Sequence, residues 1–235
     1  MNTVAATRSG MTKDSSARRK VARHEIRQLL RQRILDGECR QGSKLVQQRL
    51  AKDFGVSMGL VREALLELQA WGLVETHDNR GIFVTEWNAE RLLESYDVRE
   101  VLEGLIARLC CGRMTEEQYA ALAKLAETIY SLALAEKWEE MAQTDREFHH
   151  QLVKIAGSRM VLRLSDNYRF TGKMFWVGKA SVPDETRQSH FAIIDAIHGN
   201  RAWDAERHAR EHVSRGRKLV EEQIAKRTFD PHWIE

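Results

Sequence analysis

The segment TDREFHHQL, residues 144–152, holds side chains that could bind a metal ion. Asp145 and His149 are four residues apart, so they share one face if the segment is helical. A carboxylate oxygen and an imidazole nitrogen that project together can bind a divalent cation. The same spacing also fits an ordinary Asp–His hydrogen bond on a helix surface, so a metal site needs further ligands from other segments.

Other histidines could complete such a site. His190 lies in SHFAIIDAIHG and His212 lies in REHVSRG, within the last two helical runs of the chain. Spacing alone also allows His150, His198 or His208 as a ligand, so the residues by themselves leave the set open.

A catalytic use of such a metal is an alternative function. Glu147 and His150 form an E-x-x-H pair, which is half of the arrangement found in di-iron helical bundles, but no second E-x-x-H occurs in the chain. A metal held by histidine and aspartate could also activate water, as in a hydrolase. A metal-dependent enzyme built on a helical bundle is therefore one candidate.

The elements that must position these side chains are mainly helices. The chain contains no proline before Pro183, and after Thr85 the apolar residues recur at helical spacing without strand-like alternation. The predicted helical runs cover residues 89–112, 115–135, 138–156, 158–178, 184–198 and 202–226. We therefore expect an all-helical bundle of about six helices over residues 90–226, followed by a C-terminal tail over residues 227–235.

The first third of the chain has a different pattern. A helical run from Arg19 ends at a glycine, a short helix ends at Gly55, and Ser57 is placed as the N-cap of a third helix. After Gly72 the apolar period changes to about two, which predicts a β-hairpin around HDNRG. Residues 19–86 are thus predicted to form a winged helix-turn-helix domain, and residues 1–18 a disordered tail.

Charge and composition support two domains with different partners. Residues 1–86 carry 15 Lys or Arg and 10 Asp or Glu. Residues 87–235 carry the other 22 Lys or Arg and 24 Asp or Glu. A basic excess confined to the first domain is typical of a polyanion-binding unit.

The sequence has no apolar run of membrane-spanning length and no signal-peptide core, so we expect no membrane partner and a cytoplasmic location. Cys39, Cys110 and Cys111 have no metal-site spacing and are expected to be reduced packing residues.

Arg62 is the best candidate for reading DNA. A winged helix places its third helix in the major groove, where an arginine can pair bidentately with guanine. The competing interpretation is a solvated arginine that pairs with Glu63 or Glu67. Exposed polar residues are also expected on both flanking elements, and they could contact DNA backbone or grooves without being specific to it. These further candidates are Gln48, Arg49, His77, Asn79 and Arg80. Ser57, Met58 and Gly59, in the first turn of the third helix, can approach base edges.

The segment from Leu30 to Val84 resembles the DNA-binding domain of the GntR family of bacterial transcription regulators. The combination of VREAL, GLVE, NRG and FV carries the resemblance. The family's usual Ser-Arg-Thr-Pro-Val-Arg-Glu-Ala-Leu pattern is here Ser57-Met58-Gly59-Leu60-Val61-Arg62-Glu63-Ala64-Leu65. Arg62 is kept, but the first arginine is replaced by Met58, so we expect a changed base preference, with Met58 able to contact a thymine methyl group.

Residues 90–225 resemble the FCD domain of the FadR-type branch of this family. The resemblance implies a metal site made by Asp145, His149, His190 and His212, with zinc, nickel or manganese as the ion. It also implies a small organic acid as effector, bound near Arg99, although Arg99 could instead pair with Glu100 or Glu103. Asn167, Tyr168 and Trp176 fall on a helix that could line the same cavity, where core packing is the competing role for the aromatic residues.

Together these observations predict a sequence-specific transcription regulator, in this branch most often a repressor. We expect it to act as a homodimer on a near-palindromic double-stranded operator, under control of the organic acid. The alternatives are the metal-dependent enzyme and an architectural DNA binder that lacks an effector.

Overall fold

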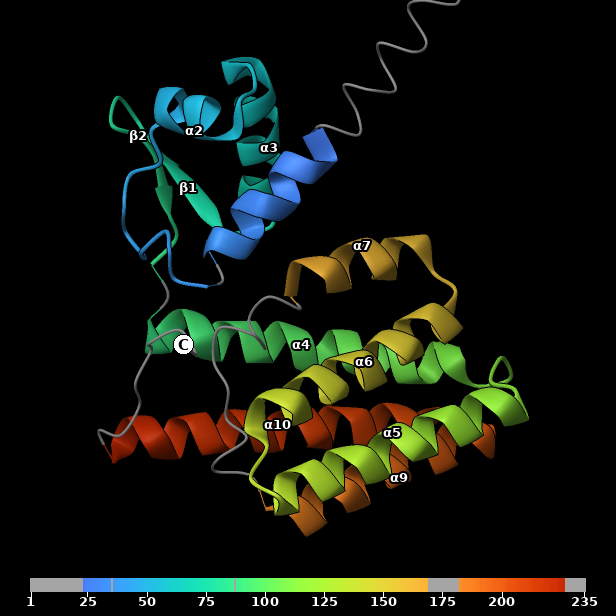
Figure 1. The fold of residues 1–235 in the computed structure, drawn as a ribbon. Coiled ribbons are helices and arrows are strands. Elements are labelled where there is room, and N and C mark those ends of the chain that lie inside the picture. The colour runs from blue at the N-terminus through green and yellow to red at the C-terminus, as the bar shows by residue number, and fades with distance from the viewer. Residues whose placement is uncertain (1–22, 35, 87, 169–181, 227–235) are drawn as a thin grey trace, which may run out of the picture. The chain divides into compact units, whose positions relative to one another are not determined.

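The structure, a computed structural model, describes residues 23–34, 36–86, 88–168 and 182–226 (Figure 1). The tails predicted over residues 1–18 and 227–235 lie outside these ranges. The chain divides into two compact units with the boundary after Glu86. The first is a winged helix-turn-helix and the second is helical in its described part, which confirms the predicted fold class.

In its described part, the first unit contains three helices followed by a hairpin. Residues 23–34 form its first helix, and the labelled elements are α2 (Gln47–Phe54), α3 (Met58–Ala70), β1 (Val74–His77) and β2 (Gly81–Val84). The helices bury an apolar core, in which Leu30, Val61, Leu65 and Leu68 have no exposed surface.

Local chemistry sets the turn between α2 and α3. Gly55 ends α2 in the left-handed conformation at φ 63°, which glycine adopts without strain. Ser57 then caps α3, because its Oγ accepts a hydrogen bond from the backbone N–H of Leu60 at 3.4 Å. The two helices therefore meet through a short, fixed turn.

The hairpin pairs Val74 with Val84 and His77 with Gly81 in antiparallel register. Asn79 lies in its turn at φ 59°, a conformation that asparagine tolerates better than most residues. The backbone N–H of Arg80 donates to the carbonyl of His77 at 3.0 Å. This turn presents Asp78, Asn79 and Arg80 to solvent.

The second unit consists, in its described part, of six helices: α4 (Ala89–Cys110), α5 (Glu116–Leu134), α6 (Trp138–Ala156), α7 (Arg159–Tyr168), α9 (Pro183–His198) and α10 (Ala202–Ala225). Helix α4 begins at Asn88, whose side chain accepts from the N–H of Arg91, and α5 begins with a capping box of Thr115 and Gln118. The part of the predicted run 158–178 that follows Tyr168 lies outside the described residues. No helix in the described ranges is long and apolar enough to cross a membrane.

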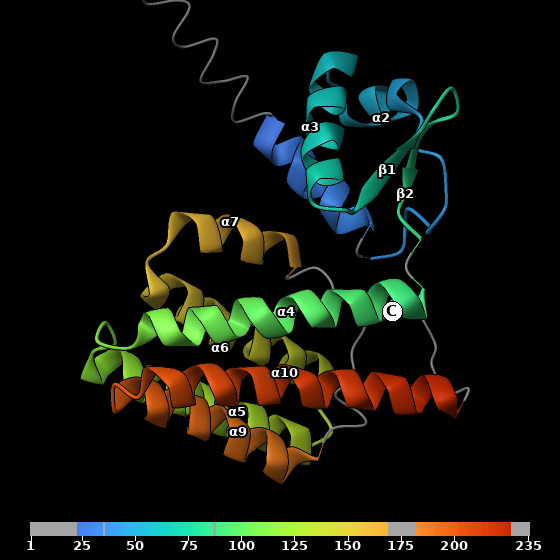
Figure 2. The same ribbon diagram turned by 180° about the vertical axis from the view of Figure 1, so that it is seen from behind.

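Helix α4 runs alongside α10, and α5 runs alongside α9, in both views of the bundle (Figures 1 and 2). Gly216 of α10 allows one close approach, since a Cβ there would lie 2.9 Å from Cε1 of Tyr96 on α4. Gly104 of α4 allows another, since its Cβ would lie 2.9 Å from Cγ of Arg210 on α10. Two glycines thus bring α4 and α10 together.

The apolar stripe of α6 determines where the polar residues of that helix face. Met141, Phe148 and Leu152 are buried in the core that α5, α9 and α10 complete. Asp145 and His149 lie on the same side of the helix, at spacings of three to four residues from these positions. Burying the stripe therefore turns both side chains towards the interior of the bundle.

Candidate metal centre and DNA-binding surface

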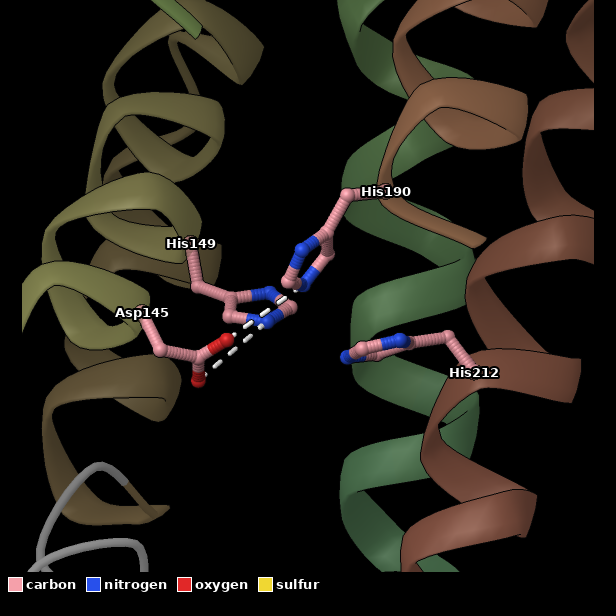
Figure 3. Close-up of side chains that lie close together, drawn as sticks. All are labelled: Asp145, His149, His190 and His212. Atoms are coloured by element: carbon pink, nitrogen blue, oxygen red, sulfur yellow. Dashed lines mark ion pairs between the residues drawn. The ribbon is translucent and has the colours of Figure 1, made fainter. Parts of the chain in front are cut away.

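Four side chains from three helices converge inside the second unit. Asp145 and His149 project from α6, His190 from α9 and His212 from α10, and they point towards one another (Figure 3). One possible ligand atom from each residue lies within 4.8 Å of the others. Three imidazoles and one carboxylate are a donor set that suits a divalent transition metal.

Asp145 lies between two of the histidines. Its Oδ1 is 3.3 Å from Nε2 of His190, and its Oδ2 is 3.8 Å from Nε2 of His149. The rings of His190 and His212 have their centroids 4.7 Å apart. His190 is fully buried and packs against the ring of Phe148 at 4.4 Å, so the core fixes its position.

Several nitrogen atoms of this cluster are buried without a hydrogen-bond partner among the described residues. They are Nε2 of His149 and both ring nitrogens of His190. An unpaired buried polar atom is rare and costs free energy unless a ligand, ion or water satisfies it. The residues therefore fit a bound cation better than a closed protein network.

The ionisation of two of these groups suits metal binding. Burial alone would raise the pKa of Asp145, but His149 and His190 outweigh it and hold that pKa below its ordinary value. Burial, together with the nearby His190 and His149, holds the pKa of His212 well below its ordinary value. A carboxylate and a neutral imidazole are the forms that bind metal.

His149 differs, because acidic groups surround it. Burial would lower its pKa, but Glu103 and Asp145 outweigh this effect and raise it. Positive charge is thus favoured at this position, and a bound cation would supply it in place of the proton.

Two residues outside the predicted set contact the cluster. Oε2 of Glu103 on α4 lies 2.8 Å from Nδ1 of His149, and Oγ of Ser189 on α9 lies 2.9 Å from Nδ1 of His212. The sequence pattern predicts Glu103 only as a possible partner of Arg99, and it predicts no role for Ser189. The available signals were the position of Ser189 directly before His190 and the four-residue spacing of Arg99 and Glu103.

The other histidines that spacing allowed do not join the cluster. His198 pairs with Glu116 at 2.8 Å, and His208 lies 3.5 Å from Glu211. His150 is absent from the group of possible ligands, and its E-x-x-H partner Glu147 instead accepts a hydrogen bond from Gln151. The part of the chain that the structure describes thus holds no di-iron arrangement of this pair.

Arg99 lies close to the cluster, and its partner is Glu103. Its Nη2 donates to Oε1 of Glu103 at 3.0 Å, and its guanidinium stacks over the ring of Tyr96 at 5.1 Å. Burial would lower the pKa of Arg99, but Glu103, Tyr96 and Asp145 outweigh it, so the guanidinium stays charged. Asn167 and Tyr168 end helix α7, but their side chains are not among those that the structure describes. Trp176 lies outside the described residues.

The predicted DNA-binding residues of α2 and α3 lie at the surface of the first unit. Gln48, Arg49, Ser57, Gly59 and Arg62 are exposed, and the side chain of Met58 is 54% exposed. In the hairpin turn Asn79 and Arg80 are exposed, whereas His77 is half-buried against Phe83 and 3.0 Å from Glu75.

The acidic neighbours of Arg62 have partners on the first helix. Arg23 lies 3.1 Å from Glu67 and 3.8 Å from Glu63, and Arg27 also pairs with Glu67. No ion pair to Arg62 is found among the described residues. Its guanidinium therefore remains available to a ligand.

Each of the two units matches a known protein family. Residues 22–84 match the family described as bacterial regulatory proteins, gntR family, and residues 94–215 match the FCD domain. The chain is 30% identical over 139 residues to an uncharacterized HTH-type transcriptional regulator, YdhC of Bacillus subtilis, a match that covers 59% of the chain and 62% of that relative.

Two further proteins match a larger share of the chain. The HTH-type transcriptional repressor RspR of Escherichia coli is 23% identical over 80% of the chain and 84% of its own length. The solved structure of McbR/YncC from E. coli covers 86% of the chain and 98% of its own length, with a TM-score of 0.66 at 19% identity, and so shares the fold. The B. subtilis and E. coli relatives YdhC and RspR are both transcription regulators by their descriptions. The chain belongs to the GntR family of bacterial transcription regulators and carries an FCD domain as its second unit.

Proposed function

We propose that the chain is a repressor whose operator binding is controlled by a small organic acid bound at a metal centre in the FCD domain. The observation that carries the proposal is the convergence of Asp145, His149, His190 and His212, with their ligand atoms within 4.8 Å of one another. Buried nitrogens without partners at this place favour a bound cation over a purely structural network.

The DNA-binding part of the proposal assigns α3 to the major groove and the hairpin turn to the neighbouring backbone or minor groove. Arg62 would contact a base or a phosphate from the front of α3, since it is exposed and forms no ion pair with any acidic side chain in the described ranges. Gln48, Arg49, Asn79 and Arg80 would position the duplex, as phosphate contacts do. The proposed partner is double-stranded DNA in the cytoplasm.

A two-fold protein reads two-fold DNA, so a near-palindromic operator calls for two copies of α3. We propose that the chain forms a homodimer for this reason. The distance between the two half-sites would follow from the separation of the two copies of α3 in the dimer.

In the metal part of the proposal, Asp145, His149, His190 and His212 hold a zinc, nickel or manganese ion. Such an ion would act as a Lewis acid to which a carboxylate oxygen of the effector can bind. The four residues supply four ligand atoms, fewer than the six that an octahedral ion takes. An open position of this kind could take a carboxylate oxygen, which is the effector group that the resemblance to the FCD domain implies.

Arg99 is proposed to recognise the same effector. Its contacts to Glu103 use two of the five N–H donors that a guanidinium offers, so donors remain for a carboxylate. The nearby ring of Tyr96 limits where the guanidinium can move. Asn167 and Tyr168 are proposed as further effector contacts on the strength of the family resemblance alone.

Effector binding would change the affinity for DNA by favouring one arrangement of the two DNA-binding units over another. A coupling free energy of about 1–3 kcal/mol would alter operator occupancy roughly 5- to 150-fold. Such a range is sufficient for a regulatory switch.

The test combines three measurements on the purified protein. Metal analysis after purification and reconstitution should find about one divalent ion for each chain. A thermal-shift screen of small organic acids on the metal-loaded protein should find an acid that raises the melting temperature, and that acid should change the affinity for operator DNA.

The outcomes distinguish the alternatives. If metal binds but no acid changes either stability or DNA affinity, an architectural DNA binder with a structural metal is the better description. Sustained turnover of an acid by the metal-loaded protein would instead favour the enzyme. Absence of any bound metal after reconstitution would contradict the metal site itself.

A further inference from the structure

His149 and His212 each make a contact on the ring nitrogen that faces away from the cluster. Nδ1 of His149 lies 2.8 Å from Oε2 of Glu103, and Nδ1 of His212 lies 2.9 Å from Oγ of Ser189. Both distances are those of hydrogen bonds. Each contact crosses between helices, from α6 to α4 in one case and from α10 to α9 in the other.

Chemistry fixes the direction of the first bond. An ionised carboxylate has only acceptor oxygens, so Nδ1 of His149 must donate to Glu103. Arg99 holds the same carboxylate from the other side, with Nη2 3.0 Å from Oε1. Glu103 is thereby kept both ionised and correctly oriented.

The direction of the second bond follows from a third group. Oγ of Ser189 lies 2.9 Å from the carbonyl oxygen of Thr186, which can only accept a hydrogen bond. The single hydroxyl hydrogen of Ser189 is used there, so the oxygen of Ser189 accepts from His212. Nδ1 of His212 therefore carries the hydrogen.

A neutral imidazole has one N–H, so a hydrogen on Nδ1 leaves Nε2 with a free lone pair. In His149 this Nε2 faces Asp145 and is buried without a hydrogen-bond partner among the described residues. The ring of His212 extends towards the other three side chains in the same way (Figure 3). Both rings thus offer Nε2 to the centre of the cluster.

We infer that Glu103 and Ser189 are positioning residues of the metal centre, which hold His149 and His212 in the tautomer that can donate a lone pair to the ion. This inference rests on the proposed metal site. Partners of this kind fix the orientation of the ligand ring and raise its basicity, and their loss weakens metal binding by about 10- to 100-fold. Glu103 is expected to have the larger effect because it is charged.

The first test uses the wild-type protein without metal. Long-range proton–nitrogen NMR spectra of the imidazole rings distinguish the two tautomers at a pH where the rings are neutral. His149 and His212 should both appear with hydrogen on Nδ1. Hydrogen on Nε2 in either ring would overturn the assignment for that residue, and this measurement requires no variant.

The second test measures the zinc affinity of variants by competition with a chromophoric chelator. Glu103→Gln should weaken binding about 10- to 100-fold, and Ser189→Ala should weaken it by a smaller factor in the same direction. Glu127→Gln is the matched control for the first change, because Glu127 also pairs with an arginine, Arg187, but lies outside the cluster. Ser165→Ala is the control for the second, because Ser165 is another buried serine whose hydroxyl bonds a carbonyl of its own helix.

The results separate this inference from the function on which it rests. If wild type binds zinc and both variants bind it equally well, the roles of Glu103 and Ser189 are wrong while the metal site stands. If wild type binds no zinc, nickel or manganese, the metal site and the inference both fail. Weaker binding by the two variants, with unchanged binding by both controls, supports the inference.

Discussion

Oδ1 of Asp145 lies 3.3 Å from Nε2 of His190, which joins α6 to α9 inside the second unit. His190 is fully buried, and its position is fixed by the ring of Phe148, while Asp145 retains partial exposure. A carboxylate at the edge of a buried histidine cluster can reach both the proposed ion and a ligand that enters from solvent.

Replacing His190 or His212 by alanine should abolish most metal binding. Loss of a direct ligand should cost more than the roughly 100-fold upper limit expected for an outer partner. Metal content measured after reconstitution checks this prediction, and unchanged content in both variants would show that the ligands are elsewhere. His198→Ala is the matched control, because His198 lies on α9 but pairs with Glu116 outside the cluster.

Metal should also stabilise the FCD domain. A ligand that binds only the folded state adds about 2.7 kcal/mol at a free concentration 100 times its Kd. Removing the ion with a chelator should therefore lower the melting temperature of wild type, and re-addition should restore it. His190→Ala should show no such response, and a response equal to that of wild type would exclude His190 as a ligand.

Arg62→Ala should weaken operator binding by about 1–3 kcal/mol, or roughly 5- to 150-fold, if the guanidinium reads a base. In that case binding to unrelated DNA should change little. If Arg62 instead grips a phosphate, both affinities should fall together and the salt dependence should become shallower. Affinity measured at several salt concentrations on both DNAs distinguishes the two roles, and no change on either DNA would remove Arg62 from the interface.

Met58→Arg should change which operator is preferred rather than whether DNA is bound. Met58 lies at the exposed front of α3, where an arginine could pair with guanine. Selection of binding sites from a random DNA pool should give different consensus sequences for wild type and variant. Identical sequences would mean that this position does not contact bases.

Arg99→Gln should weaken the response to the effector even when the protein is saturated with metal. The substitution removes the charge that suits a carboxylate, but it alters none of the four proposed metal ligands. At a metal concentration that saturates both proteins, the concentration of acid needed for half of the change in DNA affinity should be higher for the variant than for wild type. If the response to the acid is unchanged, Arg99 does not bind the effector, and its contact with Glu103 is its remaining role.

The sequence by itself determined the elements and which residues share a face within each of them. Helical periodicity, the Ser57 cap and the glycine turn predict the winged helix, and the spacing of Asp145 and His149 places both on one side of α6. These features follow from interactions between residues close in the chain, for which spacing is sufficient.

Only the tertiary structure decided which residues of different helices meet. Spacing left His150, His198 and His208 as possible ligands, and it gave no reason to join Glu103 to His149 or Ser189 to His212. These contacts depend on how each helix is rotated and how closely α4, α9 and α10 pack, which the whole core and glycines such as Gly216 set together. No single helix carries that information in its own pattern.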